Sequence, residues 1–109
     1  MNNYKNLNII NLNLNYKNLS ILINIFKKMC LIRSFELQAY YHRLNNKFST
    51  LIYLSLGQES IYSSVSEAIP NGYYFGQHRG HGIYLANKGN PRKLIDELIG
   101  LESGTNKGM

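Results

Sequence analysis

The sequence predicts a mostly α-helical chain, and three segments carry that prediction. Apolar residues recur at three- and four-residue spacing across residues 20–44, the period of one face of a helix. Residues 58–69 continue the pattern until the turn sequence Pro70-Asn71-Gly72 stops it. Residues 90–99 form a third such segment, with a start signal before it and a glycine after it. Hydrophobic residues make up 44% of the chain, which favours a folded structure over disorder.

The first helix is expected to bury an apolar stripe as plain core. Asn45-Asn46 then ends the helix, because asparagine is a poor helix former and a good turn former. Arg33 and Glu36 are three residues apart and can meet on this helix, either as a solvated pair or as a partly buried pair that fixes packing. The stripe consists of Leu22, Ile25, Phe26, Met29, Ile32, Tyr40 and Leu44.

The middle of the chain alternates between short helical and extended segments. Residues 48–56 are partly β-branched and aromatic, so they predict either a short strand or an extended link. Residues 73–77 look extended, residues 78–82 form a glycine-bearing loop, and residues 83–86 predict one helical turn.

The last helix has the best-defined ends. Asn90 is a suitable N-cap and Pro91 occupies the first helical position. Leu94, Ile95, Leu98 and Ile99 supply its apolar face, and Gly100 is placed to leave the helix in a left-handed conformation.

Composition divides the chain into two parts. Residues 1–18 are biased toward Asn, Leu, Ile, Tyr and Lys and are interpreted as a low-complexity leader, so residues 19–109 form the domain. A chain that ends at Met109, where a glycine-bearing loop begins, suggests a truncated domain.

The net charge of +6 favours anionic partners, but the basic residues are scattered rather than gathered into an arm for nucleic acid. Lys27 and Lys28 interrupt the most apolar run, so no membrane span is expected. The N-terminus resembles neither a signal peptide nor a transit peptide, which makes the cytoplasm the expected compartment. Cys30 is the only cysteine, so no internal disulfide is possible.

The densest group of chemically active residues is Gln-His-Arg-Gly-His-Gly at positions 77–82. The guanidinium of Arg79 offers a planar fork of donors that suits phosphate oxygens, and glycines let the backbone approach a ligand. His78 and His81 can donate hydrogen bonds, so the group suits a diphosphate. The alternative is a polar loop with both histidines satisfied by backbone. A zinc site is disfavoured, because structural zinc usually has four patterned ligands.

A second candidate is the turn at residues 56–58, which leads into the next predicted helix. A helix N-terminus favours anions, and Glu59 in the first turn complements the helix dipole. On composition alone, electrostatic support of the helix is the better interpretation of Glu59.

Several segments together resemble one family, in the same order along the chain. The family is the alpha subunit of the decarboxylating component of 2-oxo acid dehydrogenases, of the pyruvate, branched-chain and acetoin types. The resemblance covers about residues 27–108. The matching segments are residues 29–36 (MCLIRSFE), 56–60 (LGQES), 74–82 (YFGQHRGHG), 93–100 (KLIDELIG) and 104–108 (GTNKG).

The resemblance implies the N-terminal part of an α/β fold that binds thiamine diphosphate between alpha and beta subunits. In such enzymes the cofactor acts as the electron sink for decarboxylation of a 2-oxo acid, and the acyl group passes to a lipoyl acyltransferase. The family's Tyr-Arg cofactor pair falls on His78 and Arg79, so the tyrosine is replaced by histidine. A substrate-side histidine of the pyruvate members falls on Tyr53, which makes pyruvate itself a doubtful substrate.

The resemblance also implies a magnesium ion, whose Gly-Asp-Gly…Asn motif has no counterpart before Met109. The magnesium site would therefore lie beyond the end of this chain, and the cofactor-activating glutamate belongs to the beta subunit in this family. We accordingly expect no decarboxylation by the chain alone, and we assign it no catalytic residue. Two alternatives from other classes are a small basic module that binds nucleic acid or membrane, and a helical interaction protein that uses its nine tyrosines.

Overall fold

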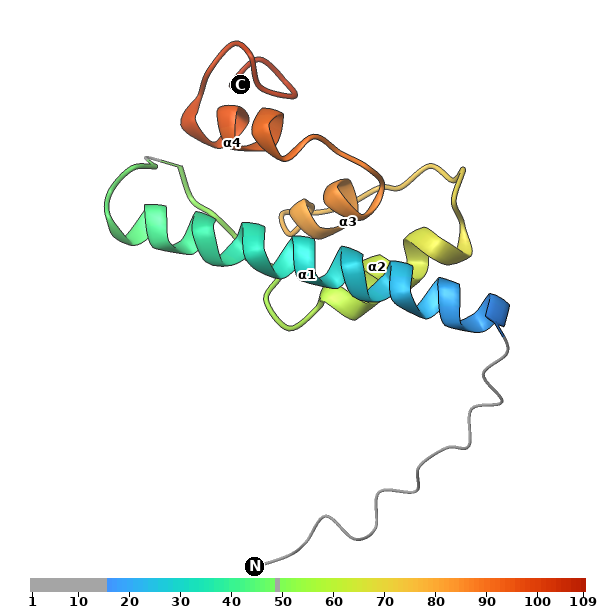
Figure 1. The fold of residues 1–109 in the computed structure, drawn as a ribbon. Helices are drawn as coiled ribbons and strands as arrows, with labels where there is room; N and C mark the ends of the chain where they lie inside the picture. Colours follow the sequence, from blue (N-terminus) through green and yellow to red (C-terminus); the bar gives the residue numbers. More distant parts are fainter. Residues whose placement is uncertain (1–15, 49) are drawn as a thin grey trace, which may run out of the picture.

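The computed structural model describes residues 16–48 and 50–109 (Figure 1). Within these residues the helices are α1 (Tyr16–Leu44), α2 (Glu59–Ala68), α3 (His81–Ala86) and α4 (Pro91–Ile99). More than half of the described residues are helical and none of them is in a strand, so the mostly α-helical prediction is confirmed. The predicted leader lies mainly outside the described residues, and residues 16–18 form the first turn of α1.

The longest helix, α1, is the element against which the others pack. Both α2 and α3 contact α1, and they also contact each other (Figure 1). The buried residues of α1 are Ile32, Phe35, Glu36 and Ala39, at the i, i+3, i+4, i+7 spacing of one helix face. An acidic residue therefore occupies one of the four buried positions on this face.

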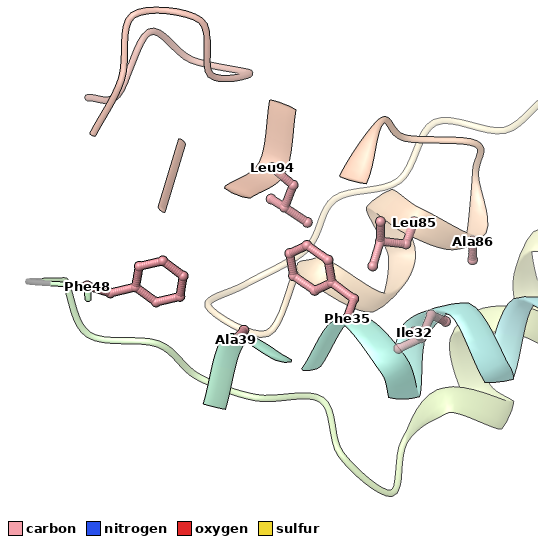
Figure 2. Close-up of a cluster of buried hydrophobic side chains, with 7 residues drawn as sticks. All are labelled: Ile32, Phe35, Ala39, Phe48, Leu85, Ala86 and Leu94. Atoms are coloured by element: carbon pink, nitrogen blue, oxygen red, sulfur yellow. The ribbon is translucent and has the colours of Figure 1, made fainter. Parts of the chain in front are cut away.

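The hydrophobic core lies between the second half of α1 and the elements that follow it. Figure 2 shows side chains of α3 and α4 facing those of α1, with Phe48 closing one side. Full burial of one such large side chain stabilises the fold by about 1.5–3 kcal/mol. The core consists of Ile32, Phe35, Ala39, Phe48, Leu85, Ala86 and Leu94.

The apolar stripe of α1 that was predicted as core is only partly buried, so the prediction was wrong for its exposed members. Ile32 is fully buried, but Leu22, Phe26, Tyr40 and Leu44 are exposed, with 65% of Phe26 accessible. The reason is the side of α1 that the other helices cover. Phe26 is exposed although nearby Lys28 bonds to α2, and Tyr40 is exposed although its neighbour Ala39 is fully buried.

Local signals fix the ends of α4 as predicted. The Asn90 side chain accepts hydrogen bonds from the backbone N–H groups of Arg92 (2.9 Å) and Lys93 (3.2 Å). Gly100 follows the helix at φ 83°, and the Leu101 N–H donates to the Asp96 carbonyl at 2.8 Å. The helix therefore begins and ends where its capping residues stand.

Helix α3 begins earlier than the sequence predicts, at His81 rather than at residue 83. The Tyr84 N–H donates to the Gly80 carbonyl at 3.1 Å, which closes the extra turn. Gly82 is buried, and a Cβ atom there would collide with the Tyr62 ring of α2. This glycine, expected to let backbone approach a ligand, instead lets two helices pack closely.

The segment between α1 and α2 is an extended link rather than a strand. Its polar groups bond to other elements instead of to a neighbouring strand. The Phe48 carbonyl accepts from Arg43 (3.2 Å), Thr50 donates to the Leu98 carbonyl (3.1 Å), and the Ser55 N–H donates to Glu36 (3.2 Å). The link is thereby anchored to α1 and α4 and passes next to the loop that precedes α3.

No helix in residues 16–48 and 50–109 has an apolar stretch long enough to cross a membrane.

Candidate functional site

The backbone of the turn at residues 77–80 is held from two sides. The carbonyl oxygen of Arg79 accepts a hydrogen bond from the Ser55 hydroxyl at 3.3 Å. The Tyr62 hydroxyl lies 3.1 Å from the same carbonyl and 3.1 Å from the side-chain oxygen of Gln58. The link before α2 and the body of α2 thus fix the main chain of Arg79.

The Arg79 side chain, by contrast, is exposed and open to a ligand. The ion pairs among the described residues use other cations: Lys28 with Glu67, Arg33 with Glu59, His81 with Glu36 and Arg92 with Asp96. No described carboxylate therefore neutralises Arg79. A fixed backbone with a free guanidinium fork fits an oxyanion such as diphosphate.

A cleft of about 220 Å³ lies beside this turn. Sites for drug-sized ligands usually enclose about 300–1,000 Å³, so this cleft admits a small anion or one end of a larger molecule. Its lining residues are Gln58, Tyr62, Gly76, Gln77, His78, Arg79 and Ile83.

His78 and Tyr53, both predicted site residues, lie against each other. Their ring centroids are 4.8 Å apart and the ring planes meet at 66°, an edge-to-face contact. Tyr53 comes from the extended link and is 47% exposed, and His78 is exposed as well. The structure therefore brings Tyr53, His78 and Arg79 to one exposed region, although Tyr53 is 25 residues distant from His78 in sequence.

His81 does not face this region. Its Nδ1 atom lies 3.3 Å from a carboxylate oxygen of Glu36, which is completely buried, and its ring contacts the edge of Phe35. Glu36 also accepts the Ser55 N–H. The Nδ1 atom of His81 is therefore taken by a buried carboxylate of α1, and this contact ties α3 to α1.

The Arg33–Glu36 pair predicted on α1 does not form. Arg33 instead donates to Glu59 at the start of α2, at 2.5 Å. The hydrogen bond from Arg33 is the largest cause that lowers the pKa of Glu59 from 4.5 to about 2, with help from the backbone N–H groups of Glu59 and Gly57. Glu59 thus does more than complement a helix dipole, because it joins α2 to α1.

Sequence reasoning missed Ser55 and Tyr62, which position the turn. Each is an ordinary polar residue on its own element, and each meets the Arg79 carbonyl only after folding, across 24 and 17 residues of chain. The local sequence gives no signal for either contact.

Among the residues that the structure describes, no three His, Cys, Asp or Glu side chains gather closely enough to hold a metal ion.

No protein-family model matches this sequence, and no curated protein and no solved structure matches it either.

Proposed function

We propose that this chain belongs to the alpha subunit of a thiamine-diphosphate-dependent 2-oxo acid dehydrogenase and that Arg79 contacts the cofactor's diphosphate. The observation that carries the proposal is the exposed guanidinium of Arg79, free of any described carboxylate, on a turn whose backbone is fixed. The five ordered sequence motifs support the same assignment. In this proposal the four helices form the N-terminal part of the α/β thiamine-diphosphate-binding fold.

Each residue of the region has a distinct part in the proposal. Arg79 donates hydrogen bonds to phosphate oxygens, and Ser55 and Tyr62 hold its backbone so that the fork points outward. His78, where the family has tyrosine, offers a ring donor next to Arg79, and Tyr53 lies on the substrate side against His78. When bound, thiamine diphosphate supplies the electron sink for decarboxylation.

The cleft of about 220 Å³ accommodates only part of thiamine diphosphate, so further walls must come from elsewhere in the assembled enzyme. The proposed partners are a beta subunit, which completes the site, and a lipoyl acyltransferase, which receives the acyl group. The proposed compartment is the cytoplasm, and magnesium would be held by residues other than those described.

The direct test is calorimetric titration of the chain with thiamine diphosphate and, separately, with thiamine, which lacks phosphate. We expect saturable binding of thiamine diphosphate and no comparable binding of thiamine. A hydrogen bond to a charged group contributes about 1.5–3 kcal/mol, so Arg79→Ala is expected to weaken binding by roughly ten- to a hundredfold. Arg79→Lys keeps the positive charge but loses the planar fork of donors. Its affinity for thiamine diphosphate should therefore fall between those of the wild type and Arg79→Ala.

Lys93→Ala is the matched control, because it removes an exposed cation on α4 that the cleft does not include. Equal losses for Arg79→Ala and Lys93→Ala would mean that net charge alone attracts the ligand. Equal affinity for thiamine and thiamine diphosphate would show that the chain does not contact the diphosphate.

A second candidate function is protein recognition, and two aromatic residues favour it. Tyr73 and Phe75 are 96% and 98% exposed and stand directly before the turn. Aromatic residues are enriched at protein interfaces. A chain whose function is protein recognition alone would bind its partner equally well with Arg79→Ala and without thiamine diphosphate.

A further inference from the structure

A larger cleft lies away from the turn, where α1, the end of α2 and the end of α3 meet. Its volume is about 520 Å³, within the range of about 300–1,000 Å³ that is typical for small-molecule sites. The turn after α2 closes one side through Pro70 and Asn71. Its lining residues differ entirely from those of the cleft beside Arg79, so the two clefts are separate.

The lining of this larger cleft is basic. Lys27 and Lys28 come from α1 and Lys88 from the residues after α3, and Glu67 is the acidic residue of the lining. Three lysines against one glutamate leave a formal charge of +2. The amides of Asn24 and Asn71 add neutral hydrogen-bond donors from two different elements.

Lys28 is held in place at the wall of the cleft. Its ammonium group donates to Glu67 at 2.6 Å and to the Ser66 hydroxyl at 2.8 Å. Ser66 is itself buried and lies 2.8 Å from the carbonyl of Ala86, so α1, α2 and α3 are linked at this point. An ammonium group has three donors, and these two contacts leave one for a ligand.

The same ion pair offsets the charge of Glu67 locally, which leaves the other two lysines to attract an anion. Lys27 and Lys88 are both exposed, and Lys88 stands at φ 63° in the left-handed region, where a residue other than glycine is uncommon. Lys27 and Lys88 therefore line the same cleft from two different segments, next to Lys28, whose ammonium group is held in place.

We propose that this cleft binds a small phosphorylated metabolite, held by Lys27, Lys28 and Lys88. The metabolite-sized volume favours a small molecule over an extended acidic chain, and the paired exposed ammonium groups favour a multiply charged phosphate. This inference is independent of the thiamine diphosphate contact at Arg79 and goes beyond the proposed function.

The test is a titration of the full, isotope-labelled chain with pyrophosphate at constant ionic strength. The NMR chemical shifts of the backbone amides are recorded at each step of the titration. We expect saturable shifts at residues 24–28, 66–71 and 86–88. The double variant Lys27→Ala/Lys88→Ala should weaken this binding by at least about tenfold, because it removes two charged donors. A second variant, Arg79→Ala, should leave these shifts and this affinity unchanged.

The matched control is Lys93→Ala/Lys107→Ala. Like Lys27, Lys93 is an exposed helical lysine, and like Lys88, Lys107 stands in the left-handed region, at φ 59°. An equal loss in both double variants would overturn the proposal, since binding would then depend on net charge alone. Shifts confined to residues 76–80 and abolished by Arg79→Ala would also overturn this proposal, while supporting the Arg79 contact. If neither cleft showed saturable shifts, both proposals would be contradicted.

Discussion

At the scale of single residues, Glu59 joins α2 to α1 with one carboxylate. It is 3% exposed, and it accepts hydrogen bonds from Arg33 and from the Gly57 N–H. The bond from Arg33 is the main reason why the pKa of Glu59 falls to about 2. Because the pKa is lower in the folded state, the ionised carboxylate stabilises the fold above the unfolded value of 4.5, and this stability is lost as the pH falls toward 2.

The substitution Glu59→Gln tests this link. At pH 7 we expect it to lower the free energy of unfolding by about 1–2 kcal/mol, the lower part of the range for a charged hydrogen bond, because Arg33 is half exposed and solvent screens the pair. The difference from the wild type should shrink between about pH 5 and about pH 2 as the wild-type carboxylate becomes protonated. Urea denaturation across this range measures both effects.

Glu102→Gln is the control, because Glu102 is exposed and forms no ion pair with any residue that the structure describes. A pH-independent difference between Glu59→Gln and the wild type would contradict the ionic link between the helices.

The residues of the candidate site differ in how far sequence predicts them. The chemistry of His78, Arg79 and the neighbouring glycines marks the turn from sequence alone, and the family resemblance adds Tyr53. Sequence places Glu36 on α1 but pairs it with the wrong partner, because helical spacing favours Arg33 whereas folding brings His81 to it. Contacts that cross more than 20 residues of chain depend on packing, which local spacing does not encode.

At the scale of the elements, the helices with local start and stop signals are the ones that the sequence predicts best. Asn90, Pro91 and Gly100 fix α4, and the Pro70-Asn71-Gly72 turn follows α2 closely. Helix α1 is also predicted, but its buried face is not, since burial depends on where α2 and α3 come to lie. Propensity and capping therefore specify the helices, whereas tertiary contacts select the side of α1 that is covered.

Two phenylalanines of α1 test which side is covered. Phe35 is 7% exposed within the core, whereas Phe26 is 65% exposed. Phe35→Ala is expected to cost about 3–5 kcal/mol of unfolding free energy, and Phe26→Ala about 0.5 kcal/mol or less. Urea denaturation followed by circular dichroism gives both values.

A small domain can unfold entirely when its free energy of unfolding falls as much as is expected for Phe35→Ala. Phe35→Leu is therefore the milder test variant, and its expected cost is less than about 1.5 kcal/mol of unfolding free energy. Equal destabilisation by Phe35→Ala and Phe26→Ala would show that the predicted stripe is buried after all.

At the scale of the whole molecule, the arrangement explains how separate segments reach one exposed region. The extended link carries Tyr53 and Ser55 along the loop before α3, and α2 presents Tyr62 from the other side. Hydrogen bonds from the Ser55 and Tyr62 hydroxyls hold the backbone of the turn, and the Arg79 side chain is left exposed. The same packing creates the lysine-lined cleft, where α1, α2 and α3 are joined through Lys28 and Ser66.

We propose that Arg79 contacts the diphosphate of thiamine diphosphate, and the decisive experiment is a crystal structure of the chain grown with this cofactor. We predict electron density for the diphosphate within hydrogen-bonding distance of the Arg79 guanidinium, beside His78, in the cleft next to the turn. Crystals grown at a saturating cofactor concentration that leave Arg79 without density, or that place the diphosphate only in the lysine-lined cleft, would contradict the claim.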